Sequence, residues 1–220
     1  EYFGGAPAIK HMTWKIIPEG SSRTIALEAG EVDFIVEVEA MDADRIQENE
    51  NLELLSVDST ALNWMVLNNE KPGLSNENVR RAINAAINKE NVITVALNGL
   101  GEVAEGEGAS MLTGYSAENT DSYDVEKAKE YMEKSGVKPS SVEMSIVCSN
   151  DTKKRAAEVI QADLKEIGIE AEIESMDLAT YLSATVEGDF TAAIGGYTAT
   201  DLITHVQGVF HSNSIGGSNQ

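Results

Sequence analysis

Cysteine is almost absent from this sequence. Cys148 is the single cysteine among 220 residues, which excludes an intramolecular disulfide framework and a multi-cysteine metal site. The segment around it, residues 142–149 (VEMSIVCS), has the composition of a strand. We therefore interpret Cys148 as a small residue of that strand rather than as a reactive thiol.

Positive charge is also scarce. The chain has 16 lysine and arginine residues against 37 aspartate and glutamate residues, and its formal net charge is −21. A surface that follows a phosphate backbone needs clustered basic residues, and a field of this sign opposes such binding. The longest basic run is residues 153–155 (KKR), so we expect no nucleic-acid partner.

Long apolar runs are missing as well. No stretch approaches the ~18 apolar residues that a membrane-spanning helix needs. The chain begins with Glu1 rather than methionine and closes on the polar stretch 213–220 (NSIGGSNQ). Targeting segments are removed from mature proteins, so the absence of a signal peptide carries no information about location. We interpret both ends as cuts in a longer protein.

A dinucleotide-binding motif is matched only in form. Residues 99–104 (GLGEVA) fit the pattern G-x-G-x-x-A, which binds a pyrophosphate when a strand precedes it and a helix follows it. Here a helical segment precedes it, and Glu102, Glu105 and Glu107 would repel a phosphate. We therefore predict a loop, not a cofactor site.

Catalytic and metal-binding patterns are lacking too. Two histidines that hold zinc from one helix need a spacing of four, whereas His205 and His211 lie six residues apart. We interpret these two and His11 as surface or half-buried residues. No nucleophile elbow, phosphate loop or Cys/His pair is present, so we expect no enzyme, no metal and no cofactor.

What the sequence does contain is an alternation of strand-like and helix-like segments. Val79, Ala82, Ile83 and Ala86 recur with the helical period. We predict helices at 21–29, 42–50, 79–87, 90–97, 124–135, 152–167 and 177–186, strands at 11–18, 33–37, 52–58, 62–68, 142–149, 169–176 and 190–195, and a long loop at 99–119. From residue 142 onward, strands and helices alternate, which indicates βαβ crossovers. The expected fold class is α/β, with a mainly parallel sheet flanked by helices.

Polar and aromatic residues follow the last predicted strand. We predict that residues 195–201 (GGYTATD) form a loop at the carboxyl end of that strand, where open α/β sheets bind their ligands. Two glycines allow a ligand to approach the backbone closely, and the other side chains offer an aromatic wall and hydrogen-bonding groups. The candidate substrate-binding residues are Gly196, Tyr197, Thr198, Thr200 and Asp201, and none is expected to be catalytic.

Several short segments lie in a characteristic order along almost the whole chain. They are residues 14–19 (WKIIPE), 27–33 (LEAGEVD), 78–90 (NVRRAINAAINKE), 123–128 (YDVEKA), 160–169 (IQADLKEIGI), 188–190 (GDF) and 195–197 (GGY). Together they resemble the peptide/nickel class of ABC-transporter solute-binding proteins. Residues 1–220 then correspond to the second, C-terminal lobe of such a protein and to less than half of its length.

The resemblance implies a fold and a function. The fold is a periplasmic-binding-protein-like lobe, and two such lobes close on a ligand by a hinge motion. The ligand is a peptide or peptide-like compound such as a dipeptide, an oligopeptide or glutathione, and the closed form delivers it to the membrane permease of an ABC importer. We expect an extracytoplasmic monomer, in the periplasm or at the cell surface as a lipoprotein. The alternatives are a nickel or haem-type ligand, a chemosensory or interaction module and, less favoured, an α/β enzyme lobe.

One departure from the family pattern concerns the ligand. The pattern G-W-x-A-D carries an acid that pairs with the ligand's α-amino group, and residues 196–200 (GYTAT) stand in its place. Thr200 replaces the acid, and Asp201 lies one residue further on. Either Asp201 takes the amine-pairing role or the ligand lacks that ammonium group. Elsewhere we expect a backbone-binding side chain at Asn68 and a buried ion pair at Arg80.

Overall fold

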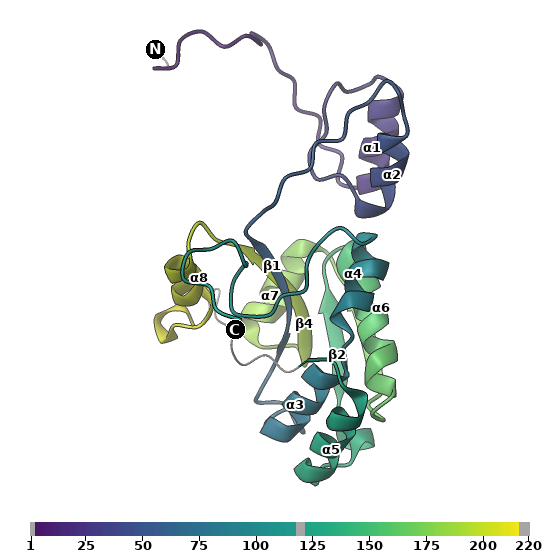
Figure 1. Ribbon diagram of the computed structural model, residues 1–220, viewed down its shortest axis with the longest axis vertical. Coiled ribbons are helices and arrows are strands. Elements are labelled where there is room, and N and C mark those ends of the chain that lie inside the picture. The colour runs from purple at the N-terminus through teal and green to yellow at the C-terminus, as the bar shows by residue number, and fades with distance from the viewer. Residues whose placement is uncertain (1–2, 118–121, 216–220) are drawn as a thin grey trace. The chain divides into compact units, whose positions relative to one another are not determined.

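A computed structural model describes residues 3–117 and 122–215. The chain divides into two compact units, Glu1–Ser56 and Val57–Gln220, and Figure 1 shows the helices and strands of each. The units are described separately below.

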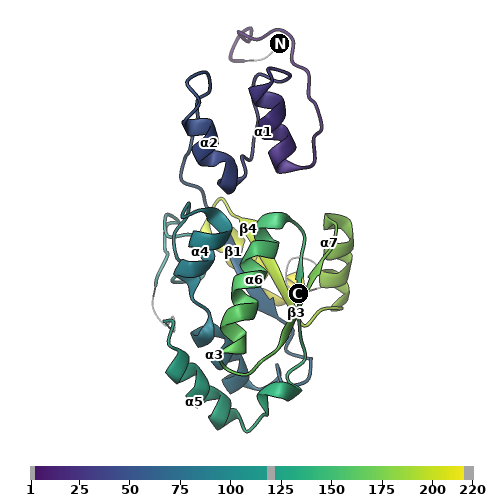
Figure 2. The same ribbon diagram turned by 90° about the vertical axis from the view of Figure 1, so that its right-hand side faces the viewer.

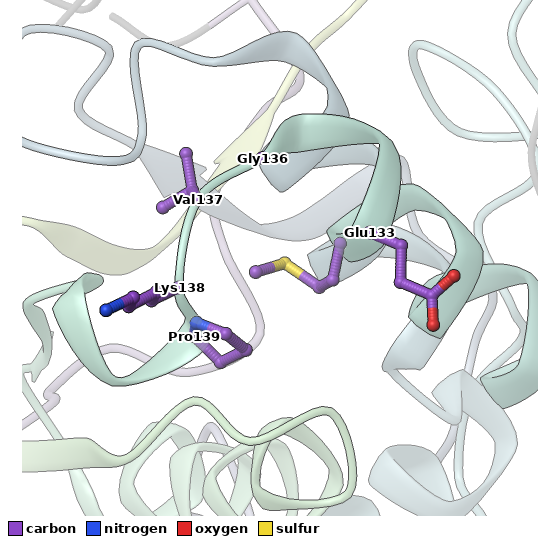
Figure 3. Close-up of a pocket in the computed structure, with 6 residues that line it drawn as sticks. Glu133, Gly136, Val137, Lys138 and Pro139 are labelled. Atoms are coloured by element: carbon purple, nitrogen blue, oxygen red, sulfur yellow. The ribbon is translucent and has the colours of Figure 1, made fainter.

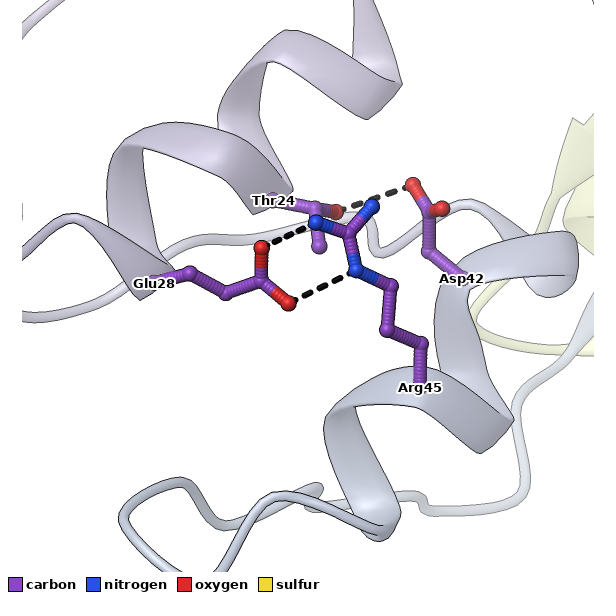
Figure 4. A network of polar contacts seen from close by, with 4 residues as sticks. All are labelled: Thr24, Glu28, Asp42 and Arg45. Carbon is purple, nitrogen blue, oxygen red and sulfur yellow. Dashed lines mark hydrogen bonds and ion pairs between the residues drawn. The ribbon is translucent and has the colours of Figure 1, made fainter.

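The first unit contains two helices that are joined by polar contacts. They are α1 (Gly20–Glu28) and α2 (Ala43–Gln47), the latter preceded by a 3-10 turn at Ala40–Asp42. Figure 4 shows Arg45 bridging to both carboxylate oxygens of Glu28, with Nε 2.7 Å from Oε1, and the Thr24 hydroxyl donating to Asp42 at 3.0 Å. We predicted Asp42 at the start of this helix, and the structure places it there. Its side chain bonds Thr24 instead of the helix backbone.

Three strands predicted in the first part of the chain were wrong. The residues at 11–18, 33–37 and 52–58 belong to no strand. Their alternating apolar side chains point into solvent, and Trp14 and Ile16 are 76% and 93% exposed. Alternation indicates an extended chain, but a strand also requires a hydrogen-bonding neighbour. Here the guanidinium of Arg23 binds the carbonyls of Ile17, Pro18 and Glu37 in place of a ladder.

The second unit is built on a four-stranded sheet in the order β1-β4-β2-β3. The strands are β1 (Ala61–Leu67), β2 (Met144–Cys148), β3 (Ala171–Ser175) and β4 (Ala192–Thr198). β2 is parallel to both of its neighbours, whereas the edge strand β1 is antiparallel to β4. The predicted α/β class with a mainly parallel sheet is confirmed.

Six helices of this unit are described: α3 (Glu77–Ala86), α4 (Lys89–Leu97), α5 (Val125–Ser135), α6 (Asp151–Lys165), α7 (Leu178–Glu187) and α8 (Leu202–Val209). All except α8 were predicted. Both ends of α5 are capped: the Asp124 carboxylate accepts the Lys127 amide at 3.0 Å, and Gly136 has a φ of +67°.

The sheet separates two apolar clusters. Ile146 and Ala192 contribute to a large cluster with α3, α4, α5 and α6, whereas Val147 and Ala193 contribute to a smaller one with Tyr181 of α7. Successive residues of a strand point to opposite faces, so the helices after β2 and after β3 cover different faces of the sheet. Figure 2 shows α6 and α7 on these two sides.

Two side chains with expected structural roles can be compared with the structure. Asn68 donates to the carbonyls of Gly188 and Phe190 at 3.1 and 3.2 Å, as predicted. The buried ion pair predicted for Arg80 was wrong, because its guanidinium instead donates to the carbonyls of Leu74 and Ser75 at 2.9 and 3.1 Å. The turn before α3 presents free carbonyls at this point, and the guanidinium satisfies them.

Across the part of the chain that the structure describes, every helix is too short or too polar to span a lipid bilayer.

Ile146 provides a test of the core. Its side chain is 0% exposed in β2, so Ile146→Ala should lower the free energy of unfolding by about 2–5 kcal/mol through lost transfer energy and a residual cavity. Ile146→Val should cost only about 0.5–1.5 kcal/mol. Urea titrations followed by circular dichroism measure both values. A loss no larger than that of Glu172→Ala, at an exposed position of β3, would contradict the packing described here.

Candidate ligand-binding site

The candidate segment 195–201 is part strand and part helix cap, so its prediction as a loop was wrong. Residues 195–198 continue β4 and pair with β1, where Gly195 lies opposite Trp64 and Gly196 opposite Asn63. Glycine weakens a strand on its own. Here pairing with β1 keeps the two glycines in the strand, since the register between β1 and β4 continues unbroken to Thr198.

β4 extends further than its parallel neighbour. Its register with β2 covers Ala192 and Ala193, so residues 194–198 have β1 as their strand neighbour. Within the described residues, no backbone group of a loop forms a hydrogen bond with residues 194–198. The Tyr181 hydroxyl donates a hydrogen bond to the carbonyl of Ile194 at 3.0 Å. The carboxyl end of β4 thus presents backbone groups beside the end of β2.

The candidate residues of β4 lie on opposite faces of the sheet. Tyr197 shares one face with Gly195, and Gly196 and Thr198 lie on the other face. Tyr197 is half-buried, and Gly196 and Thr198 are exposed. A Cβ at Gly196 would lie 2.5 Å from the Asn63 side-chain oxygen, so this position excludes larger residues without a shift of Asn63. The structure does not bring the five candidates onto one surface of the sheet.

Thr200 and Asp201 form the start of α8. The Asp201 carboxylate accepts the Thr204 amide and the Thr204 hydroxyl, each at 2.8 Å, and the Thr200 hydroxyl at 3.2 Å. These hydrogen bonds, that of the Thr204 amide first, lower the pKa of Asp201. Both residues are exposed. Asp201 is therefore an ionised helix cap whose orientation is fixed by α8.

His205 was predicted at or near the surface, and the structure buries it. Its side chain is 2% exposed, and its ring lies 5.9 Å from Trp64, 5.8 Å from Tyr197 and 6.1 Å from Phe210 between ring centroids. Sequence reasoning missed this aromatic cluster because its members come from β1, β4 and α8. A histidine one turn after a cap residue was the available signal, and α8 itself was not predicted.

The long segment between α4 and α5 packs against α8. Its described residues contain no helix or strand, as predicted for 99–119. Gly108 is buried, and a Cβ there would lie 2.8 Å from a methyl group of Leu202 and 4.0 Å from the His205 ring. Leu112 is 7% exposed. This segment therefore covers part of the aromatic cluster, and glycine permits its close approach.

A second group of titratable residues lies at the carboxyl end of β2. Burial raises the pKa of the Cys148 thiol and of Tyr181, and it lowers the pKa of Lys153. The Lys153 ammonium lies 5.3 Å from the centre of the Tyr181 ring, a cation–π contact. The interpretation of Cys148 as a strand residue is confirmed, since it ends β2 and is 0% exposed.

A hollow lies at the carboxyl end of α5. Met132, Glu133 and the turn 136–139 surround a volume of about 320 Å³ (Figure 3). Pro139 packs against Gly168 here, with a Cβ at that glycine 3.1 Å from the proline ring. The residues that line the hollow are mostly apolar, and the hollow is open to solvent. We attribute the hollow to the way the turn packs. Among the described residues, no three histidine, cysteine, aspartate or glutamate side chains gather in a way that could hold a metal ion.

The Cys148 thiol should be inert in the folded protein. Its burial and raised pKa keep it protonated and out of reach, whereas the thiolate is the reactive species. We expect iodoacetamide to modify it many times more slowly in native protein than in urea-unfolded protein at the same pH, as measured by mass spectrometry. Equal rates in the two states would show that this end of β2 is open.

Asp201 should stabilise α8 as a cap. Asp201→Ala should cost about 0.5–2 kcal/mol of local stability, which corresponds to roughly two- to thirtyfold faster amide exchange in α8. Asp201→Asn and Asp201→Ser should retain most of the protection, because their side chains also cap helices. Unchanged exchange rates in Asp201→Ala would contradict the capping role.

Comparison with known proteins connects this geometry to a family. Residues 1–214 match the family model described as "Bacterial extracellular solute-binding proteins, family 5 Middle". The chain is 29% identical over 227 residues to Heme-binding protein A of Haemophilus influenzae, covering 99% of this chain and 41% of that protein. It is 27% identical over 203 residues to the dipeptide-binding protein of Escherichia coli, covering 90% and 38%.

Solved structures agree with this match. The periplasmic binding protein DppA of Helicobacter pylori, associated with an ABC transporter and solved in complex with the peptide STSA, superposes with a TM-score of 0.82 at 26% identity, over 92% of this chain and 41% of that one. The chain thus spans about two fifths of the length of these relatives. The resemblance seen in the sequence is confirmed, and the matching family consists of solute-binding proteins. The chain belongs to the bacterial extracellular solute-binding proteins, family 5.

Proposed function

We propose that this chain is the second lobe of a two-lobe extracytoplasmic protein that binds peptides or peptide-like ligands for an ABC importer. The observation that carries the proposal is the open stretch of β4 at residues 194–198. An extended ligand can add its own backbone to such an edge. The dipeptide- and peptide-binding relatives support the same ligand class.

The aromatic cluster supplies the second part of the proposed site. Trp64 and Tyr197 are half-buried beside the open stretch of β4, and His205 packs behind them. Rings of this kind offer large contact area with little loss of conformational freedom. We propose that they form one wall of a cleft whose other wall belongs to the first lobe, and that lobe closure buries the ligand. The permease partner, the monomeric state and the periplasmic or lipoprotein location belong to the same proposal.

Asp201 is proposed as a cap and not as the partner of the ligand's ammonium group. Its carboxylate already accepts three hydrogen bonds from Thr200 and Thr204, and α8 fixes its direction. Gly196, Tyr197 and Thr198 then contribute neutral contacts, together with Thr200. This favours ligands that need no acid at this position, the second of the two alternatives drawn from the sequence.

A haem-type ligand is the second candidate. Heme-binding protein A of Haemophilus influenzae is 29% identical over 99% of this chain, and an aromatic wall of Trp64, Tyr197 and Phe210 suits a flat apolar ring system. Titration with haemin, followed by absorption spectroscopy, separates this candidate from peptide binding.

The ligand class can be tested on the longer protein that carries this chain. Native mass spectrometry should show a bound peptide or peptide-like compound, and calorimetry should give much weaker binding of that compound by the 220-residue chain alone, because one wall of the cleft is missing. Equal affinities would contradict the two-lobe proposal.

The role of Asp201 has its own outcome. In the longer protein, Asp201→Asn should change the affinity little, whereas Tyr197→Ala should lower it. A loss of about tenfold or more on Asp201→Asn is the size expected for a charged hydrogen bond. If this loss occurs with a ligand that has a free amino group and not with the N-acylated ligand, Asp201 pairs with the ligand's ammonium group.

A further inference from the structure

The segment between α4 and α5 contains a stretch that closes on itself. The two ends of residues 106–116 meet, because a Cβ at Gly106 would collide with the carbonyl oxygen of Ser116. Inside this stretch, the Leu112 amide donates to the carbonyl of Ala109 at 3.0 Å. A compact surface loop whose ends lie close together is an Ω-loop, and loops of this kind are frequently functional. Residues 106–116 are called the strap below.

The strap is attached to α8 by apolar contacts. A Cβ at Gly108 would lie 2.8 Å from one terminal methyl carbon of Leu202, and a Cβ at Gly114 would lie 3.6 Å from the other. Leu112 is 7% exposed, and one of its methyl carbons would lie 3.6 Å from the same Cβ at Gly108. In the described part of the chain, no backbone hydrogen bond joins residues 106–115 to another element. Figure 1 shows this teal segment beside α8.

The strap covers His205. A Cβ at Gly108 would lie 4.0 Å from the imidazole ring, whose side chain is 2% exposed. The other rings around His205 belong to Trp64, Tyr197 and Phe210. Strand pairing holds the first two, and a hydrogen bond to the last turn of α8 holds the third. The strap is therefore the cover that neither the sheet nor a helix holds by hydrogen bonds.

Such an attachment has low local stability. Segments with few buried apolar contacts open at a lower free energy than the strands and helices beside them. Within the strap, Leu112 is buried, whereas its neighbour Met111 is 55% exposed. By contrast, Cys148 is 0% exposed and lies in β2 between two paired strands. Opening of the strap would release Leu202 and expose His205 while the sheet stays intact.

We propose that the strap opens from α8 as a unit in the folded protein, and that its closed state holds the aromatic wall in position. Leu202 is the first residue of α8, and His205 lies one turn further along, against Tyr197. A closed strap therefore fixes the side of the wall that faces away from the ligand. A ligand that contacts the wall binds the closed state more tightly and, by linkage, keeps the strap closed. This coupling to the ligand rests on the proposed function, whereas the opening itself does not.

Histidine modification measures the opening in the longer protein that carries this chain. With diethyl pyrocarbonate as reagent and peptide mapping by mass spectrometry as readout, His205 should react more slowly than the exposed His11. Leu112→Ala should raise the rate at His205 about tenfold or more, because the buried side chain that holds the strap is lost. Met111→Ala is the matched control at an exposed position and should leave the rate unchanged. Iodoacetamide, applied to a parallel sample, should modify Cys148 as slowly as in wild type.

The same measurement in wild type guards against an unfolded variant. As urea is raised below the unfolding transition, the reaction at His205 should accelerate before the reaction at Cys148 does. Equal rates at His205 in Leu112→Ala and Met111→Ala would show that the strap does not cover the histidine. Exposure of His205 and Cys148 at the same urea concentration would show that the imidazole becomes accessible only when the sheet opens. Either result overturns the proposal.

Binding of glutathione by the longer protein tests the coupling. Saturating glutathione should slow amide hydrogen exchange in the strap, and Leu112→Ala should weaken glutathione binding about fivefold or more, while Met111→Ala should not. If glutathione binds and neither effect occurs, the coupling is wrong and the proposed function stands. If glutathione fails to bind while Leu112→Ala still exposes His205 selectively, the opening of the strap stands and the proposed ligand class fails.

Discussion

The pairing of β4 with a strand on each side constrains most of the second unit. Its first residues are held by β2, its whole length is held by β1, and helices cover both of its faces. Where the helices pack closely against such a strand, there is room for small side chains and not for large ones. Ala192 and Ala193 are 0% exposed, and Gly195 lies against Trp64 and Tyr181. The composition of β4 follows from its central place in the sheet.

The same strand determines what the carboxyl edge can present. β2 ends at Cys148 while β4 continues to Thr198, so the difference in length leaves backbone groups without a parallel neighbour. The chain then turns into α8, whose first turn is held by Asp201 and whose His205 is enclosed by rings from two strands. Backbone edge, aromatic wall and helix cap are therefore consequences of one extended strand, and a change in its register would move all three.

Local signals predicted the elements whose stability is local. The helical face of Val79 and Ile83 could be recognised in the sequence because a helix satisfies its hydrogen bonds within itself. Strands depend on partners that cannot be identified from local sequence. The alternation at Trp14 and Ile16 predicted a strand for which the described residues provide no neighbouring strand, and the glycines after Ile194 led us to predict a loop where β4 continues beside β1. The burial of His205 and the contact between Lys153 and Tyr181 arise from residues distant in sequence, so no pattern could reveal them.

Net charge and local charge lead to different expectations for the ligand. A chain with a formal charge of −21 would attract cations at long range, but salt screens such fields within about 8–10 Å. Partly buried groups are screened less, and at the carboxyl edge the two relevant charges differ in how they are satisfied. The Asp201 carboxylate accepts hydrogen bonds from the first turn of its helix, whereas the partly buried Lys153 ammonium lies over the Tyr181 ring. The local environment of each group, rather than the net charge of the chain, therefore decides how these two charges are stabilised at this edge.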